Sequence, residues 1–240
     1  MSRLIRRGDL VFDIGAHTGS KAEVFLAEGA RVVCVEPQPH CLAEPRRKLG
    51  GNRRLQTVAG GLGATAGSAL LSTCTDSDVL STFTEEWKQG RFAQFVWDQQ
   101  LEVPMSTLDV LIERYGTPRY CKLDVEGFEL DVLKGLSQPI PFLSFEFAIE
   151  FPDAAAACIR HLHALGYVGF NFSRADESRL ALADWCTSDD ILQWLHAEAK
   201  ANPLAWGDIF ATSLPDPSVS VLPPLRLGLL RRIVTRWTSL

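Results

Sequence analysis

Short apolar runs alternate along this chain with longer segments in which apolar residues recur at helical spacing. Such runs are typical of buried parallel strands, and the longer segments are typical of helices packed on a sheet. Strands are predicted at residues 10–14, 31–36, 55–59, 118–121, 142–146, 167–172 and 208–212. Helices are predicted at residues 20–28, 38–49, 107–115, 131–136 and 153–165. This order of elements predicts an α/β fold.

Three regions interrupt the regular pattern. Pro39 and Pro45 predict that the second helix starts late or is irregular. After a loose glycine-rich turn, residues 68–72 and 101–105 can pair as accessory antiparallel strands. Between them, residues 74–100 form either a lid and substrate wall or a plain cover for the sheet, and they carry Trp87, Phe92, Phe95 and Trp97.

The stretch from 175 to 207 is also predicted to be irregular. Ile191, Trp194 and Leu195 have helical spacing within it, which indicates core packing.

Length and charge narrow the class of protein. A chain of 240 residues can bury one large core, and its formal charge of -5 argues against nucleic acid as the main partner. The six cysteines are scattered, which predicts reduced thiols in a cytoplasmic protein. Histidines and cysteines show no convincing metal-ligand spacing, so no metal is expected, although Asp124, Glu126 and Glu146 could in principle hold a divalent ion. No signal peptide and no run of membrane-spanning length is expected.

A candidate ligand-binding loop lies between the first two predicted strands in the sequence. Asp13 lies at the end of the first strand, and Gly15 and Gly19 follow it in the loop before the helix. Glycines let a backbone approach a ligand closely, and the amides of a helix start attract negative charge. Glu36 closes the second strand, where a carboxylate can accept hydrogen bonds from a ribose diol.

Two cofactors fit this unit, a dinucleotide and S-adenosylmethionine. The dinucleotide fingerprint requires a third glycine at the pyrophosphate, and the spacing Asp13-x-Gly15-x-x-x-Gly19 lacks it. S-adenosylmethionine has no pyrophosphate, and Asp13 is placed to serve its cationic amino-acid end.

A cluster of charged residues follows the strand at 118–121. It contains Lys122, Asp124, Glu126 and Glu129. Charges are costly to bury, and ligands bind at the carboxyl ends of the strands in open α/β sheets. The cluster therefore predicts a site, although acids that simply favour the start of a helix would look similar.

With these motifs the chain resembles the FkbM family of S-adenosylmethionine-dependent methyltransferases. The resemblance extends from about residue 8 to about residue 211. The resemblance rests on blocks at residues 11–19, 35–37, 106–109 and 122–135, in the family's order. One departure is His17, where the family more usually has Asn. The resemblance implies a Rossmann-like class I methyltransferase sheet, mostly parallel with an antiparallel last strand and with helices on both faces.

The cofactor implied is S-adenosyl-L-methionine. The residues expected to bind it are Asp13, Gly15, Ala16, His17, Gly19, Glu36, Pro37, Ala59 and Asp124. The candidate catalytic residues are Asp124, Glu126, His17 and Lys122. His17, Glu126 and Asp124 are candidate bases, although loop packing or cofactor contact also explains His17. Lys122 is expected to neutralise part of the acidic cluster.

The expected reaction is O-methylation of a hydroxyl on a sugar, a glycan or a polyketide-like small molecule, as the resemblance implies. An NAD-dependent oxidoreductase is the second hypothesis. A non-catalytic cofactor-binding domain of the same fold is the third. The catalytic domain is expected at residues 1–213.

Residues 214–240 are predicted to form a Pro-rich linker and a basic amphipathic C-terminal helix. Such a helix can lie on an anionic membrane or bind a partner protein. It can also fold back on the acidic domain or pair two subunits as a homodimer. The expected location is cytoplasmic, with possible attachment to the inner face of the membrane.

Overall fold

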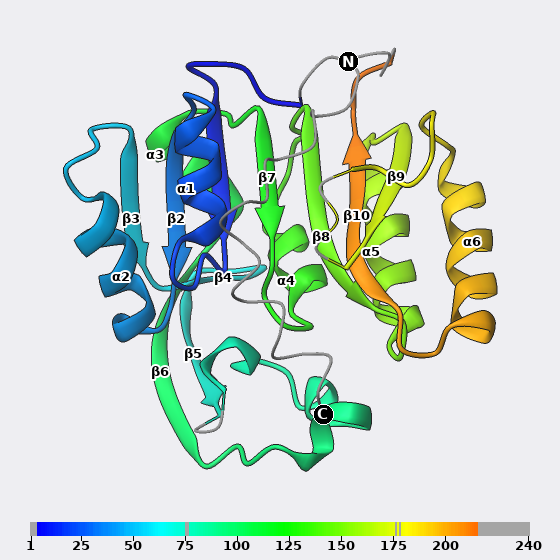
Figure 1. Cartoon of the computed structure of the whole chain (residues 1–240), viewed down its shortest axis with the longest axis horizontal. Helices are drawn as coiled ribbons and strands as arrows, with labels where there is room; N and C mark the ends of the chain where they lie inside the picture. The colour runs from blue at the N-terminus through cyan, green and yellow to red at the C-terminus, as the bar shows by residue number, and fades with distance from the viewer. Residues whose placement is uncertain (1–3, 75–76, 176, 178, 216–240) are drawn as a thin grey trace.

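The computed structural model describes residues 4–74, 77–175, 177 and 179–215. Its centre is a seven-stranded sheet in the order β3-β2-β1-β7-β8-β10-β9 (Figure 1). The strands are β1 (Leu10–Ile14), β2 (Arg31–Glu36), β3 (Leu55–Ala59), β7 (Tyr120–Leu123), β8 (Phe142–Ala148), β9 (Gly169–Arg174) and β10 (Trp206–Thr212). The helices are α1 (Ser20–Ala27), α2 (Pro39–Leu49), α3 (Leu108–Tyr115), α4 (Glu129–Lys134), α5 (Pro152–Leu165) and α6 (Ser188–Ala201).

The strand directions confirm the predicted sheet. Strands β3, β2, β1, β7 and β8 pair in parallel. β10 enters between β8 and β9 and is antiparallel to both. The chain runs outward in opposite directions from β1 and β7, so the strand order reverses between these two strands. Crevices at such reversals are where ligands bind in open α/β sheets.

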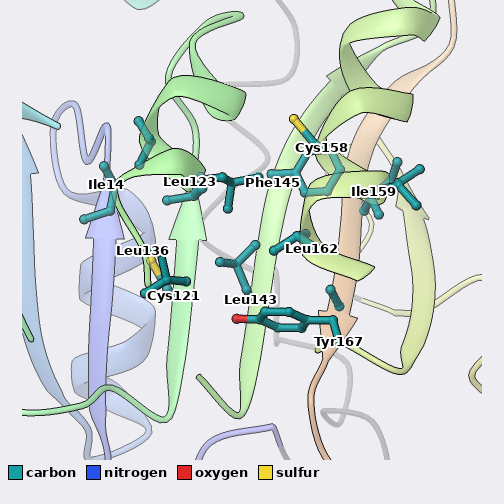
Figure 2. Packing of buried hydrophobic residues seen from close by; sticks show 14 of the residues in the cluster. Ile14, Cys121, Leu123, Leu136, Leu143, Phe145, Cys158, Ile159, Leu162 and Tyr167 are labelled. Atoms are coloured by element: carbon teal, nitrogen blue, oxygen red, sulfur yellow. The ribbon is translucent and has the colours of Figure 1, made fainter. Parts of the chain in front are cut away.

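Two hydrophobic cores cover the two faces of the sheet. One core joins α1 to the strand residues Val11, Val32 and Cys34. The other contains the intervening strand residues, such as Phe12 and Val33, together with residues of α3, α4, α5 and α6. Figure 2 shows part of this second core, where side chains of β7 and β8 meet those of α5. Helices therefore lie on both faces, as expected.

A smaller sheet has the order β4-β6-β5, and its strands β5 and β6 lie beyond the carboxyl ends of the parallel strands, at the bottom of Figure 1. Its strands are β4 (Gly61–Leu62), β5 (Gly67–Thr73) and β6 (Gln99–Ser106). The antiparallel pairing of β5 with β6 confirms the prediction for these segments. β4 was expected to be turn; instead it pairs in parallel with the end of β6.

Between β5 and β6 the chain forms three short 3-10 helices, η1 (Asp78–Leu80), η2 (Glu86–Lys88) and η3 (Gly90–Gln94). We call residues 77–98 the insertion. It carries most of a third hydrophobic cluster, which includes Leu80, Trp87 and Phe92 and reaches Ala148 at the end of β8. The insertion is thus packed onto the main sheet edge and is not a detached hairpin.

Three local predictions were wrong. The second helix starts at Pro39, because a proline in the first turn loses no helical hydrogen bond there. Residues 188–201 form α6, and the signal was present in the sequence, because Thr187 and Asp190 make a capping box. The strand predicted from residue 167 begins at Gly169.

The late start of β9 follows from how α5 ends. Gly166 adopts a left-handed φ of 106° and caps the helix. The N–H of Tyr167 then bonds back to the carbonyl of Leu162, so that residue still belongs to the helix cap. The Tyr167 hydroxyl accepts a hydrogen bond from the N–H of Ile140 and is buried in the core. Ile191 and Leu195 of α6 are fully buried, as their spacing predicted.

Candidate active site

A cavity of about 1320 Å³ opens at the carboxyl ends of β1, β2, β7 and β8. This exceeds the roughly 300–1,000 Å³ typical of a site for one small molecule, so it has room for a cofactor and an acceptor together. The structure brings most of the predicted site residues to this cavity, namely Asp13, Gly15, Ala16, His17, Glu36, Pro37, Asp124 and Glu126. Ala59 is exposed at the end of β3, while its neighbours Gly60 and Gly61 line the cavity.

The glycine loop owes its shape to contacts on two sides. Gly15 has a φ of 76°, and a Cβ there would lie 1.7 Å from the carbonyl oxygen of Asp124, so only glycine fits. Gly19 has a φ of 77°, and its Cβ would lie 2.7 Å from Pro45 of α2. Gly15 thus brings the loop against the end of β7, and Gly19 lets it pack under α2.

Glu36 is buried and already holds the loop. Its carboxylate accepts hydrogen bonds from the backbone N–H groups of His17 and Gln38, each at 2.8 Å. Burial raises the pKa of Glu36, and these N–H groups partly offset the rise. A carboxylate has about four acceptor positions. Glu36 therefore keeps capacity for the two hydroxyls of a ribose.

Asp13 is the second buried acid at this end of the cavity. Its Oδ2 atom is shielded from solvent and has no hydrogen-bond partner among the described residues. Burial raises the pKa of Asp13 from 3.8 to about 7, against the lowering effect of Lys122. An unpaired buried carboxylate oxygen is costly unless a ligand pairs with it. A cationic ammonium group would do so.

Lys122 lies beneath the cavity and links two strands. Its Nζ is 2.9 Å from Oδ1 of Asp208 on β10 and 3.1 Å from Oδ2 of Asp124. Burial alone would lower the pKa of Lys122, but Asp124 and Asp208 raise it well above its usual value. Lys122 neutralises part of the acidic cluster, as expected. Sequence reasoning missed Asp208, which showed only as the first residue of a predicted strand.

Three carboxylates converge in the same cavity. One oxygen each from Asp124, Glu126 and Glu146 lies within 4.8 Å of the others. Burial raises the pKa of Glu126 and of Glu146 well above the usual range, and the charge of Asp124 adds to both shifts. The same burial acts on Asp124, but Lys122 outweighs it and the pKa of Asp124 is lowered. We call these three residues the carboxylate cluster.

The loop that carries Glu126 is strained and held in place. Glu126 and Gly127 both have positive φ angles, 52° and 90°. The Glu129 carboxylate accepts the N–H groups of Val125 and Gly127 at 3.2 and 3.3 Å. From the insertion, the Thr82 hydroxyl donates to the Glu126 carbonyl at 2.6 Å. These contacts hold the backbone of the loop on both sides of Glu126.

The insertion supplies an aromatic wall to the cavity, formed by Phe83, Trp87, Phe92 and Phe95. Trp87 stacks on Phe92 with ring centroids 4.9 Å apart and packs against Phe151 at 5.2 Å. Arg91 Nη2 pairs with Oε2 of Glu150 at 2.8 Å. The two interpretations of residues 74–100 are therefore compatible, because the same aromatics cover the sheet edge and line the site.

His17 belongs to the cofactor end of the cavity. Its backbone N–H binds Glu36, and its Nε2 atom lies 3.2 Å from Oδ1 of Asp78 on η1. His40 Nε2 lies 3.3 Å from the other oxygen of Asp78. Asp78 had no signal in the sequence, because it stands in an irregular segment.

The strand order, the glycine loop and the acid that closes β2 define a Rossmann-like methyltransferase. The chain belongs to the FkbM methyltransferase domain family, whose profile matches residues 13–168. The cofactor of this domain is S-adenosylmethionine, as the resemblance implied. The residues present fit it, because Glu36 suits the ribose, the orphaned Asp13 oxygen suits the ammonium group, and Gly15 permits close backbone approach.

Two solved structures with a similar course of the chain carry the name of a methyltransferase. Precorrin-6y C5,15-methyltransferase from Geobacter metallireducens GS-15 is 10% identical, with a TM-score of 0.46 over 87% of this chain and 82% of that one. The C-terminal domain of precorrin-6Y C5,15-methyltransferase from Rhodobacter capsulatus is 13% identical, with a TM-score of 0.44 over 86% and 82%. Likeness of this extent carries no information about the reaction or its substrate. A search of curated protein sequences finds no match.

None of the helices in the described part of the chain is both long and apolar enough to cross a membrane. All six cysteines are free thiols.

Proposed function

We propose that this protein transfers a methyl group from S-adenosylmethionine to a hydroxyl of a sugar, a glycan or a polyketide-like small molecule. When bound, S-adenosylmethionine supplies an electrophilic methyl group on a sulfonium ion. The chain's own residues must then hold the acceptor oxygen in line with that methyl group and take its proton. The carboxylate cluster, in the same cavity as Asp13 and Glu36, is the observation that carries the proposal.

Glu126 is the base in this proposal. A hydroxyl is a weak acid, and a carboxylate whose pKa is raised accepts its proton more readily than an ordinary one. Burial and the neighbouring Asp124 charge supply that rise at Glu126. Lys122 favours the ionised form of Asp124. In this proposal Asp124 faces the amino-acid end of the cofactor. Positioning by the rigid Glu126 loop adds to the effect of the base.

The aromatic wall supports an acceptor with apolar ring faces. Phe92 and Phe95 of the insertion line the cavity together with Phe128. Aromatic rings contact the carbon–hydrogen face of a sugar or a polyketide over a large area, while the carboxylates and Gln99 and Gln100 offer hydrogen-bond partners to its hydroxyls. A cavity with these two kinds of wall fits a polyhydroxylated small molecule.

One set of measurements tests the proposal. Calorimetric titration with S-adenosylhomocysteine should show binding, and titration with NAD should not. Mass spectrometry of reactions with candidate sugars and polyketide-like alcohols should then detect a product heavier by one methylene. Binding without any product from a broad acceptor panel would favour the non-catalytic domain, and NAD binding would favour the oxidoreductase.

Glu126→Gln should lower turnover strongly and leave the affinity for S-adenosylhomocysteine nearly unchanged. The reduction expected for loss of a general base is about 10²–10⁴-fold. Glu113→Gln is a matched control, because Glu113 is exposed on α3. If Glu126→Gln abolished cofactor binding and left the turnover of the residual complex intact, the role assigned to Glu126 would be wrong.

A further inference from the structure

Three side chains of metal-binding type meet beside the cofactor end of the cavity. They come from three separate segments: His17 from the glycine loop, Cys41 from the first turn of α2, and Asp78 from η1. One ligand atom from each lies within 4.8 Å of the others. This cluster is distinct from the carboxylate cluster, and the proposed methyl transfer does not use it.

The distances match those between ligands around one small cation. His17 Nε2 is 3.2 Å from Oδ1 of Asp78, and Cys41 Sγ is 3.7 Å from its Oδ2. In a tetrahedral zinc site with bonds of roughly 2.0–2.3 Å, neighbouring ligand atoms lie roughly 3.3–3.7 Å apart. The side chains are thus spaced for a shared metal ion with little movement.

Hydrogen bonding does not account fully for this arrangement. His17 Nε2 is shielded from solvent and makes no well-aligned hydrogen bond to any described residue. The Asp78 carboxylate lies 3.2 Å away, but the angle is unfavourable for a hydrogen bond. Cys41 is fully buried, and its thiol is at best a weak donor to Asp78. An imidazole nitrogen, a sulfur and a carboxylate oxygen therefore gather in one place, and a cation that replaced the thiol proton could bind all three.

The ligand types also select the kind of metal. Calcium and magnesium take oxygen ligands, whereas sulfur and imidazole favour Zn²⁺ and related transition metals. Cys41 lies in the first turn of α2, where the helix dipole favours a thiolate.

We propose that His17, Cys41 and Asp78 bind one Zn²⁺ ion or a similar transition-metal ion. His40 holds the second oxygen of Asp78 at 3.3 Å and orients that ligand. Binding displaces the Cys41 thiol proton to solvent, and no other bond changes. This proposal differs from the expectation from sequence that no metal is bound, which rested on the absence of a local ligand spacing.

The ion would tie the insertion to the cofactor loop. Asp78 is already docked there, because Gln38 Nε2 donates to its carbonyl at 2.9 Å and Ser81 donates to the Gln38 side chain at 3.1 Å. His17 in turn binds Glu36 through its backbone N–H. A metal that joins Asp78 to His17 would therefore hold the wall of the cavity next to the ribose carboxylate.

Cobalt substitution tests the site without reference to methyl transfer. Full-length protein without an affinity tag is stripped with a chelator and titrated with Co²⁺. A thiolate-to-cobalt charge-transfer absorption band should appear and saturate at one equivalent, and Zn²⁺ should displace it. Elemental analysis of protein reloaded with Zn²⁺ should give the same stoichiometry.

Variants separate this site from other metal binding. Cys41→Ser should abolish the charge-transfer band, while Cys186→Ser should leave it unchanged, because Cys186 bonds the Phe170 carbonyl on the far part of the sheet. Asp78→Asn should weaken Co²⁺ binding strongly with the thiol intact. His40→Ala should weaken it by about 10–100-fold, as loss of an outer-shell partner does.

Absence of the band in the wild-type protein would overturn the proposal, as would a band that persists in Cys41→Ser. Circular dichroism checks that each variant is folded. If Cys41→Ser does not fold, Asp78→Asn and His17→Gln decide the matter, and unchanged Co²⁺ affinity in both would equally overturn it. A band lost in Cys186→Ser would place the metal elsewhere.

Discussion

Two buried acids at the cofactor end of the cavity differ in what they bind within the protein. Glu36 accepts two backbone N–H groups, whereas one oxygen of Asp13 has no hydrogen-bond partner among the described residues. The first environment keeps a carboxylate in a fixed direction with spare acceptor positions. The second leaves a position that a ligand cation can fill. In the proposed function, neutral hydroxyls would bind at Glu36 and a cationic ammonium group at Asp13.

Glu36→Ala should weaken S-adenosylhomocysteine binding by about 1–3 kcal/mol, the range for hydrogen bonds to a charged group. The variant loses the acceptor for the ribose hydroxyls and releases the N–H groups of His17 and Gln38. Isothermal calorimetry measures the change, with Glu113→Ala as the control. An unchanged dissociation constant in a folded Glu36→Ala protein would contradict the assignment.

Asp13→Asn should alter how stability depends on pH. Burial raises the pKa of Asp13 from 3.8 to about 7, so between these values the folded protein retains a proton that the unfolded chain releases. The contribution of Asp13 to the stability of the folded protein should therefore fall as the pH rises from 3.8 to about 7, and it should stay low above that range. The Asp13→Asn protein has no carboxyl group at this position, so its stability should not fall in this way.

Urea unfolding of both proteins at about pH 5 and about pH 8 measures the effect. The stability of Asp13→Asn relative to the wild type should be greater at the higher pH. The same difference at both values would show that the Asp13 carboxyl titrates normally in the folded state.

At the scale of elements, the insertion supplies one wall of the cavity. It packs on the loop between β7 and α4 through Thr82 and Trp87, and its aromatics form one wall of the cavity. The insertion has few regular hydrogen bonds of its own, so its position depends on these contacts. Changes at the contact should loosen the wall without disturbing the parallel strands.

Gly127→Ala should disrupt that contact. A Cβ at Gly127 would lie 2.8 Å from the Trp87 ring and 3.1 Å from Thr84, at a φ of 90° that favours glycine. A loss of about 1–3 kcal/mol in stability is expected from the combined strain and overpacking. Faster proteolysis within residues 77–98 should accompany it.

Gly51→Ala is the control for this experiment. A Cβ at Gly51 would meet nothing within 4 Å, and the residue has no positive φ. It should therefore leave stability and proteolysis close to the wild type. Gly127→Ala protein with wild-type stability and an equally protected insertion would mean that the insertion does not rest on this loop.

At the scale of the whole molecule, the described fold is complete before the tail. The last strand of the seven-stranded sheet, β10, ends at Thr212. The predicted basic helix at residues 225–240 lies outside the described residues, as does most of the predicted linker before it. The division into a catalytic domain at 1–213 and a separate tail therefore stays a prediction, as do membrane attachment and dimer formation through that tail.

Deletion of residues 216–240 should leave S-adenosylhomocysteine affinity unchanged, because the cavity and the sheet are built from earlier residues. It should reduce sedimentation with anionic vesicles or change the oligomeric state. Each arginine near an anionic surface is worth about 1 kcal/mol, and added salt should weaken vesicle binding of the full-length protein. A truncated protein that fails to fold would show that the tail packs on the catalytic domain.

The sequence by itself determined the sheet, the glycine loop and the acids that close its strands. These features depend on neighbouring residues: an apolar run forms a buried strand, and the residue after it lies at the strand end. Since parallel strands place those ends along one edge, Asp13, Glu36 and Asp124 were predictable as members of one site. The cap at Thr187 was equally local, although the helix that it starts was missed.

Only the tertiary structure decided which side chains meet across that edge. Lys122 and Asp208 are 86 residues apart, and they pair because β10 inserts between β8 and β9. Glu146 joins Asp124 and Glu126, and Asp78 reaches His17 and Cys41, through similarly distant segments. Such contacts depend on strand order and on the docking of the insertion. Neither the strand order nor the docking of the insertion can be predicted from a local sequence pattern, because both arise when buried surfaces far apart in the chain pack together.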